Sequence, residues 1–227
     1  MCRISIHQSQ YIPWPPYFTK IASSEIFVIM DSVQFQKNGV QNRNKIRGKQ
    51  GEFWLTIPVT GHLSDLISEK HVSDFRWNKK HWNSLVTSYS KAPFWNLYAA
   101  ELEDIYMAKE DNLGRINEKF LFYIVNKLGL KTKILRTSDL EVAGNKSDLV
   151  LNICKILNAK TYISGSGAKG YLIEEDFIRN NIFIEYKESK PPVYEQFNGE
   201  FIPGLSILDM MFNVDIEDLR ILLFQDK

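Results

Sequence analysis

The pattern that most constrains the fold is a pair of short apolar segments separated by a short helical one. Residues 3–8 alternate apolar side chains and end in His7 and Gln8, and the apolar run 25–31 ends in Asp31. Such near-continuous apolar runs are typical of strands buried on both faces of a parallel sheet. Between them, prolines precede a short apolar stretch, residues 17–22, as they often do at the start of a helix. The pattern predicts a strand, a helix and a second, parallel strand.

The same alternation returns in the second half of the chain. Further strands are predicted at residues 133–136, 161–164 and 181–186, and helices at 147–157 (with Ser147 as its N-cap), 174–178 and 206–212. Helical periodicity also predicts three helices within residues 75–130. Strands interleaved with helices favour an α/β fold. We therefore expect one domain, residues 1–227, with a mostly parallel Rossmann-like sheet and a helical insertion around residues 75–130.

Two smaller features complete this prediction. Residues 45–47 and 51–60 are expected to pair as a hairpin across the glycines Gly48 and Gly51. Residues 65–72 are expected to form another short strand. There is no internal repeat, low-complexity segment or evident linker.

Composition and charge exclude several classes of protein. The chain is 44% hydrophobic, which is incompatible with general disorder, and 28 basic against 27 acidic residues give no global attraction to nucleic acid. Cys2 and Cys154 lie far apart, so we expect neither a disulfide framework nor a cysteine metal site; Cys154 is expected to be buried on a helix. The chain also lacks a glycine-rich dinucleotide fingerprint, a Walker A motif, a nucleophile elbow and zinc-ligand spacing. With no signal peptide and no apolar segment of membrane-spanning length, we expect a cytoplasmic protein.

The first candidate site follows the first strand, where His7, Gln8, Gln10, Tyr11 and Trp14 gather. Ligands of open α/β sheets bind at the carboxyl ends of the strands, which favours a site here by about two to one. His7 would act as a general base or as a hydrogen-bond donor to a phosphate. The alternative is that His7 only caps the strand.

A second candidate follows the next strand, where Asp31 and Gln34 lie. Adjacent parallel strands would bring them near His7. The carboxylate would suit an amine, a ribose hydroxyl or Mg²⁺, although an isolated Asp is more commonly an N-cap.

Amides and cations are concentrated in residues 41–45, which include Asn42, Arg43, Asn44 and Lys45. Arg binds carboxylate or phosphate through two parallel hydrogen bonds, and Lys supplies a point charge. An anion or amide site and a solvated loop are about equally favoured here. His81, beside two lysines, would also suit an acidic substrate, but an exposed position on a helix is favoured.

The third candidate is the turn Ser164, Gly165, Ser166 and Gly167, with Tyr171 beyond it. It follows a strand and precedes a helix, so its backbone N–H groups are placed to bind an anion. A flexible turn without a ligand is equally favoured. No metal site is predicted.

Several segments carry a resemblance to a known family. The chain resembles the WbqC-like protein family in residues 4–14, Asp31-Ser-Val-Gln34-Phe35, residues 41–46, Lys91-Ala-Pro93, Ile163-Ser-Gly165 and Leu205-Ser-Ile-Leu-Asp209. The similarity covers nearly the whole chain; it departs at Ser9, where the family usually has proline, and at Pro15-Pro16, where it has Leu-Gly. The first strand, helix and second strand are also similar to the start of pantothenate synthetase, without the second histidine of its H-x-G-H motif.

The resemblance implies a role in O-antigen, that is lipopolysaccharide, biosynthesis, because members are commonly encoded among surface polysaccharide genes. It implies an acyl or aminoacyl transferase, for example of glycine, or an ATP-dependent amide ligase, acting on a nucleotide-linked amino sugar. His7, Gln10, Tyr11 and Asp31 would be catalytic. Gln8, Trp14, Gln34, Asn42, Arg43, Asn44, Lys45 and His81 would bind substrate, and Ser164–Gly167 with Tyr171 would bind phosphate.

The acyl donor would be ATP-activated, with or without Mg²⁺, or an aminoacyl-tRNA. No membrane partner is expected, and no nucleic acid unless tRNA is the donor. A homodimer is an open alternative for the oligomeric state. The rival functions are a non-catalytic protein that binds a nucleotide sugar for a partner enzyme and, less favoured, nucleic-acid binding through the basic loop 36–49.

Overall fold

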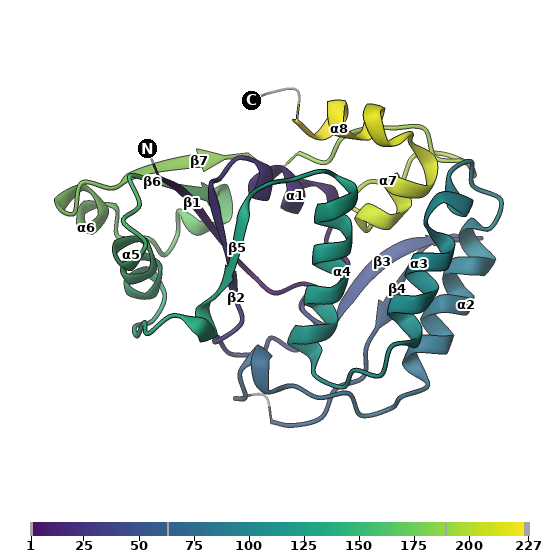
Figure 1. Cartoon of the computed structure of the whole chain (residues 1–227), viewed down its shortest axis with the longest axis horizontal. Coiled ribbons are helices and arrows are strands. Elements are labelled where there is room, and N and C mark those ends of the chain that lie inside the picture. The colour runs from purple at the N-terminus through teal and green to yellow at the C-terminus, as the bar shows by residue number, and fades with distance from the viewer. Residues whose placement is uncertain (1, 63, 189, 225–227) are drawn as a thin grey trace.

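A five-stranded parallel sheet forms the centre of the computed structural model, which describes residues 2–62, 64–188 and 190–224 (Figure 1). The strands run in the order β5-β2-β1-β6-β7, and every neighbouring pair is parallel. Their bounds are β1 Arg3–Gln8, β2 Ile26–Met30, β5 Lys133–Arg136, β6 Thr161–Gly165 and β7 Phe183–Lys187. The expected α/β class with a Rossmann-like parallel sheet is confirmed.

The strand order reverses at β1. From β1 the chain proceeds outward through β2 to β5, and then returns to β6 on the other side of β1. In open α/β sheets, ligands bind in the crevice outside the carboxyl ends of the strands at such a switch point. The carboxyl ends of β1 and β6 carry His7-Gln8 and Ser164-Gly165, which belong to two of the four segments predicted as candidate sites.

Helices cover both faces of this sheet (Figure 1). Helices α1 (Pro15–Ala22) and α4 (Leu113–Lys127) pack on one face, and α5 (Ser147–Ile156) and α6 (Glu174–Arg179) on the other. Alternate side chains of a strand point to opposite faces. Ile4 and Ile6 therefore join the α5–α6 core, while Ser5 and His7 meet α1.

The rest of the chain extends the α1–α4 side. The hairpin of β3 (Arg43–Gly48) and β4 (Gly51–Thr56) forms as expected and packs with α2 (Trp77–Tyr89) and with α7 (Ile207–Asn213). Helix α3 (Trp95–Met107) packs between α2 and α7, and α8 (Ile216–Phe224) packs on α1. The three helices expected around 75–130 are present, and the last of them, α4, is also the sheet-covering helix that leads into β5.

Two local predictions are wrong. Residues 65–72 do not form a strand: they contain one 3₁₀ turn, η1 (Ile67–Glu69), followed by isolated bridges at His71 and Val72. Ser147 does not cap α5, because its hydroxyl accepts a hydrogen bond from the backbone N–H of Ile173 (2.9 Å) and the preceding Lys146 has φ of 50°. Helix α8 was not predicted either.

Both cysteines are unpaired, and Cys154 is buried on α5 as expected. Burial raises the pKa of its thiol to about 12, so a nucleophilic role is disfavoured.

Short 3₁₀ turns follow β5 (η2, Thr137–Asp139) and β6 (η3, Ser166–Ala168). Within the described residues, no helix has both the length and the apolarity needed to span a bilayer.

Candidate functional site at the carboxyl ends of the strands

His7 lies at the carboxyl end of β1, with its ring 4.8 Å from that of Tyr17 on α1. Its Nδ1 is 3.4 Å from Nε2 of Gln10 and 3.3 Å from the backbone oxygen of Gln8. The two hydrogen bonds found for the ring among the described residues share Nδ1, which in a neutral ring either accepts from the Gln10 amide or, when protonated, donates to the oxygen of Gln8. Neither uses Nε2, which is left to meet a ligand. Burial, reinforced by the charge of Lys20, lowers the pKa of His7 to about 3, so the imidazole is neutral at pH 7.

Lys20 is a site residue that the sequence reasoning missed. Its Nζ donates a 2.7 Å hydrogen bond to the backbone oxygen of Ile6, and burial lowers its pKa to about 8. The sequence held a usable signal, because Lys20 follows Tyr17 by three residues and residues three apart share one face of a helix. A lysine on the sheet-facing side of a short helix is unusual unless it meets a polar partner.

A small cavity of about 50 Å³ lies at the switch point. It is bounded by α1, the end of β6 and the segment after β7: Pro16, Thr19, Lys20, Ser164, Gly165, Lys187, Glu188 and Lys190. Three lysines against one glutamate favour an anion. A pocket that encloses a whole small molecule is about 300–1,000 Å³, so this one has room for a small group such as a phosphate.

The turn after β6 is open above this cavity. A Cβ added at Gly165 or Gly167 would meet nothing within 4 Å, so a ligand has room to approach the backbone. Ser164 is buried, with its hydroxyl 3.3 Å from the backbone oxygen of Gly165, whereas Ser166 is exposed. Tyr171, three residues beyond η3, is 44% exposed. Ser164 and Gly165 of the predicted anion-binding turn therefore lie beside Lys20.

A second cavity, of about 450 Å³, lies between the loop after β2 and the end of β4. It is lined by Phe35, Lys37, Asn38, Asn42, Arg43, residues 56–61 and Lys70. Lys70 is only 2% exposed; its Nζ donates to the backbone oxygen of His62, lies 3.2 Å from Oδ2 of Asp65 and is 5.1 Å from the ring centre of Phe35. The described lining holds three cations and no acidic side chain, which suits a sugar-sized anionic ligand.

Glutamine hydrogen bonds link the end of β1 to this second cavity. Oε1 of Gln8 accepts from Nε2 of Gln41 at 3.0 Å, and Oε1 of Gln41 accepts from the backbone N–H of Gln36 at 2.7 Å. The backbone N–H of Tyr11 also donates to the oxygen of Val40 at 3.2 Å. The segment that leaves β1 therefore runs beside the segment that enters β3, next to Asn42.

The polar run at 42–45 is divided by strand alternation. Asn42 and Asn44 are buried and donate to backbone oxygens of Ile57 and Ile12, each at 2.8 Å. Arg43 lies with its guanidinium 4.2 Å from the ring centre of Trp54, and Lys45 forms an ion pair with Glu52. The structure therefore does not gather these side chains around one ligand; Asn42 and Arg43 line the second cavity and the other two do not.

Tyr11 and His81 meet each other, away from His7. The hydroxyl of the fully buried Tyr11 lies 2.9 Å from Nδ1 of His81 and 2.7 Å from the hydroxyl of Tyr106. Nε2 of His81 lies 3.2 Å from the backbone oxygen of Thr56. The expectation that His81 occupies a solvated helix face is wrong, because it lies one turn after the buried Trp77 on the core side of α2. Trp14, at the start of α1, packs partly buried against the same core.

Asp31 is held by the residues that follow β5. Its carboxylate accepts from the hydroxyl of Thr137 (2.8 Å) and from the backbone N–H and hydroxyl of Ser138 (2.9 and 2.6 Å). These bonds tie η2 to the end of β2, on the side of β2 away from β1. Gln34 is exposed and forms an isolated antiparallel bridge with Leu66.

Comparison with known proteins supports the fold-wide resemblance. A model of the WbqC-like protein family matches residues 8–221. The chain belongs to the WbqC-like protein family. A relative, "Uncharacterized protein Rv1507c" of Mycobacterium tuberculosis (strain ATCC 25618 / H37Rv), is 35% identical over 223 residues, which cover 96% of each chain. No solved structure matches. The family match includes Gln8, Lys20 and the turn after β6, and begins one residue after His7.

Proposed function

We propose that this WbqC-like protein is an acyl or aminoacyl transferase, or an ATP-dependent amide ligase, acting on a nucleotide-linked amino sugar in surface polysaccharide biosynthesis. The observation that carries this proposal is the cationic cavity at the switch point. Its Lys20 also acts electrostatically on His7, and the Gln8–Gln41 hydrogen bond joins the end of β1 to the segment that leads to a larger cationic cavity. The smaller cavity would take a phosphate or carboxylate of the donor. The larger one would take the sugar.

Amide formation joins an amine nitrogen to an activated acyl carbon. The C–N bond forms, the bond from that carbon to the leaving group breaks, and the amine gives up a proton. Donors must stabilise the oxyanion that develops on the acyl group. Lys20, charged at neutral pH and fixed by the oxygen of Ile6, is placed to supply this stabilisation together with the backbone of the Ser164–Gly167 turn.

His7 is better suited to donating a hydrogen bond than to removing a proton. An efficient general base has a pKa near the working pH, whereas the pKa of His7 is lowered to about 3. If Nδ1 accepts from the amide of Gln10, Nε2 carries the hydrogen and donates to a phosphate or oxyanion. This tautomer supports the phosphate donor among the two roles expected for His7. With the hydrogen on Nδ1, donated to the oxygen of Gln8, Nε2 would instead be an acceptor.

ATP, where it serves as the activating reagent, would supply a phosphoryl or adenylyl leaving group. The lysines of the small cavity and the open backbone at Gly165 and Gly167 suit its phosphates. Among the described residues, no group of three or more His, Cys, Asp or Glu side chains is arranged to hold a metal, so any Mg²⁺ would enter bound to the phosphates.

The direct test is incubation with a dTDP-4-amino-sugar, using glycine with ATP in one arm and glycyl-tRNA in the other. Mass spectrometry should detect the sugar carrying one added acyl unit. The arm that reacts identifies the donor. No mass gain in either arm, nor with acyl donors other than glycine, would overturn the proposal.

Two lysine variants test whether the reaction takes place at the switch point. Lys20→Met should lower turnover about a hundredfold, as loss of an oxyanion donor does. Lys155→Met is the matched control, because Lys155 is an exposed lysine on α5, on the opposite face of the sheet. Equal activity of the two variants would show that the acyl transfer takes place elsewhere.

The low pKa of His7 also favours a second candidate, a non-catalytic protein that presents a nucleotide sugar to a partner enzyme. This candidate predicts that the nucleotide sugar raises the melting temperature of the protein and that Lys20→Met abolishes this rise. It also predicts that the protein alone transfers no acyl group. Transfer by the isolated protein rules it out.

A further inference from the structure

We propose that the groove around the tip of the β3–β4 hairpin is a second ligand site, which binds an anionic carbohydrate. The ligand class is a sugar that carries a phosphate or a carboxylate. The groove shares no lining residue with the two cavities described above. The hairpin tip points toward the α2 side of the molecule, away from the parallel sheet (Figure 1).

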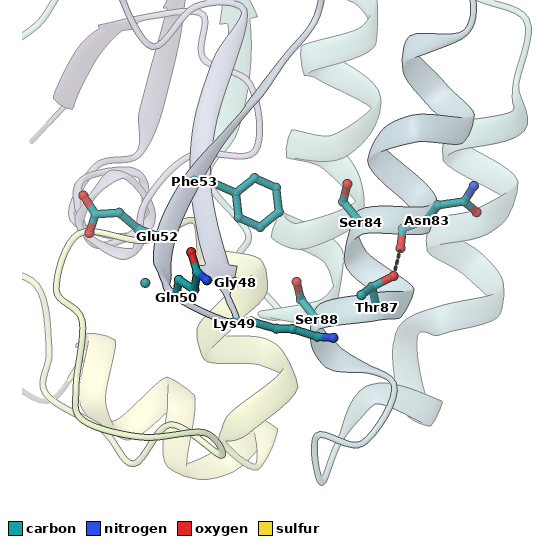
Figure 2. Close-up of a pocket in the computed structure, with 10 residues that line it drawn as sticks. Gly48, Lys49, Gln50, Glu52, Phe53, Asn83, Ser84, Thr87 and Ser88 are labelled. Atoms are coloured by element: carbon teal, nitrogen blue, oxygen red, sulfur yellow. Dashed lines mark hydrogen bonds between the residues drawn. The ribbon is translucent and has the colours of Figure 1, made fainter.

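Two adjoining cavities form this groove. One, of about 680 Å³, lies between the hairpin tip and α2 (Figure 2). The other, of about 500 Å³, lies between the tip, the end of α2 and residues 197–199. Both are lined by Gly48, Lys49, Thr87 and Ser88, so they adjoin one another. Each is open to solvent, with a volume in the range of small-molecule sites.

Hydroxyl and amide groups line the α2 side of the groove. Figure 2 shows Asn83, Ser84, Thr87 and Ser88 along α2, opposite the hairpin. The hydroxyl of Thr87 donates to the backbone oxygen of Asn83 (2.8 Å), and that of Ser84 donates to Lys80 (2.9 Å). Because a hydroxyl has one donor and two acceptor sites, these two groups are set to accept hydrogen bonds from a polyol.

An aromatic ring lies on the hairpin side. Phe53 is 37% exposed, and Figure 2 shows its ring between the hairpin and α2. A Cβ at Gly48 would lie 2.8 Å from Cδ1 of this ring, so the absence of a side chain at Gly48 is what lets the ring lie against β3. A fixed aromatic face next to hydroxyl and amide groups suits the C–H face and the hydroxyls of a sugar ring.

The charges in the groove favour an anion on that sugar. Lys49 lines both cavities, and Lys91 lines the second. Arg47, only 7% exposed, also lines the second cavity; it donates to Gln196 and to the backbone oxygens of Asn198 and Glu200, and its buried Nε has no hydrogen-bond partner in the described structure. Glu52 is the one acid in the described lining, and it is paired with Lys45.

Isothermal titration calorimetry with four probes tests the proposal: glucose 1-phosphate, glucuronate, glucose and inorganic phosphate. Glucose 1-phosphate and glucuronate should bind, with glucose and phosphate each at least about tenfold weaker, as expected from losing one charge-assisted contact or the ring contact. If phosphate bound as tightly as glucose 1-phosphate, the groove would be an anion site that does not recognise the sugar, which would contradict the proposal. Absence of binding by both anionic sugars would overturn the proposal outright.

Variants of residues in the groove test whether the sugar binds there. Lys49→Met should weaken both anionic sugars about tenfold, and Phe53→Leu should weaken all three sugars. Gly48→Ala is a second, independent variant, because its Cβ should displace the Phe53 ring while the lysines remain. The control is Lys155→Met, and thermal unfolding checks that each variant is folded. Binding that survives the groove variants but is lost in His7→Ala would place the sugar at the switch point and overturn the inference.

Discussion

The two regions around His7 and His81 both bury a histidine and lower its pKa, but they differ in how the imidazole ring is hydrogen-bonded. Burial lowers the pKa of His7 to about 3 and that of His81 to about 4. At His81, Nδ1 meets the hydroxyl of Tyr11 and Nε2 meets the backbone oxygen of Thr56, so both ring nitrogens are engaged within the protein. At His7, the bonds to Gln8 and Gln10 both use Nδ1.

The difference separates a structural histidine from a candidate functional one. Perturbed pKa values are enriched at functional sites but also arise in structural networks, so the shift itself does not discriminate. The ring nitrogen without a partner in the described structure, on a histidine that feels the charge of the cavity residue Lys20, does. The Tyr11–His81–Tyr106 network accordingly belongs to the core, and the His7–Lys20 region is where ligand chemistry is expected.

The largest expected effect is on catalysis by His7 variants. In His7→Gln the amide nitrogen lies near the position of Nε2, whereas in His7→Asn it lies near that of Nδ1. If Nε2–H donates to the ligand, Asn should lower kcat/KM about a hundredfold and Gln only about tenfold, the equivalent of one weakened hydrogen bond. Steady-state kinetics of the acyl transfer measure both. Equal losses confined to kcat would instead assign His7 as a general base.

The next effect is on stability at His81. His81→Leu removes one of the two partners of the Tyr11 hydroxyl, which keeps Tyr106, and the partner of the Thr56 oxygen. The unsatisfied oxygen costs about 1–3 kcal/mol and the lost hydrogen bond about 1 kcal/mol, so unfolding in urea should show a loss of about 2–4 kcal/mol. His7→Leu is the matched control and should cost less, since the hydrogen bonds of the ring use only Nδ1. A larger loss of stability in His7→Leu than in His81→Leu would indicate that His7, and not His81, is the structural histidine.

Both histidines should make stability depend on pH with the same sign. Their pKa values are lower in the folded than in the unfolded protein, so the unfolded chain binds more protons between about pH 6.5 and pH 3–4. Stability is therefore complete above pH 6.5 and falls as the pH drops, by at most about 1.4 kcal/mol per pH unit for each histidine.

Urea unfolding of the parent, His7→Gln and His81→Gln between pH 7 and pH 5 checks this dependence. In each single variant, the free energy of unfolding should depend less steeply on pH than in the parent. The variant that combines His7→Gln with His81→Gln should lose most of the pH dependence that the histidines cause. An unchanged slope in His7→Gln would mean that His7 is solvated and titrates normally.

The smallest effect is expected for Tyr11→Phe, which removes one hydroxyl from the core network. Its loss should cost about 1 kcal/mol in unfolding and change kcat/KM by less than about threefold, because the hydroxyl bonds only within the core. A large loss of turnover with unchanged stability would return Tyr11 to the catalytic role that the sequence predicts for it.

Much of the fold could be predicted from the sequence because its signals are local. The apolar runs of β1, β2 and β6, the periodicity of α2 and α4, and the Gly48–Gly51 turn each specify one element through neighbouring residues. The alternation of strands with helices then indicates a parallel sheet, and the carboxyl ends of its strands indicate where a site lies. His7 and the Ser164–Gly167 turn are predicted as site residues in this way. Membership of the WbqC-like family, predicted from the resemblance of several motifs, is confirmed by the family match over residues 8–221.

Tertiary structure alone decided which polar side chains line the candidate cavities. Asp31, Tyr11, Asn44 and His81 are as polar in the sequence as His7, yet each is hydrogen-bonded to a segment remote in the chain. Lys20 and Lys70 are ordinary lysines in the sequence and become candidate site residues because other elements bury them beside these cavities. Burial and hydrogen-bond partners are properties of elements brought together by packing, and no local pattern of residue types records them.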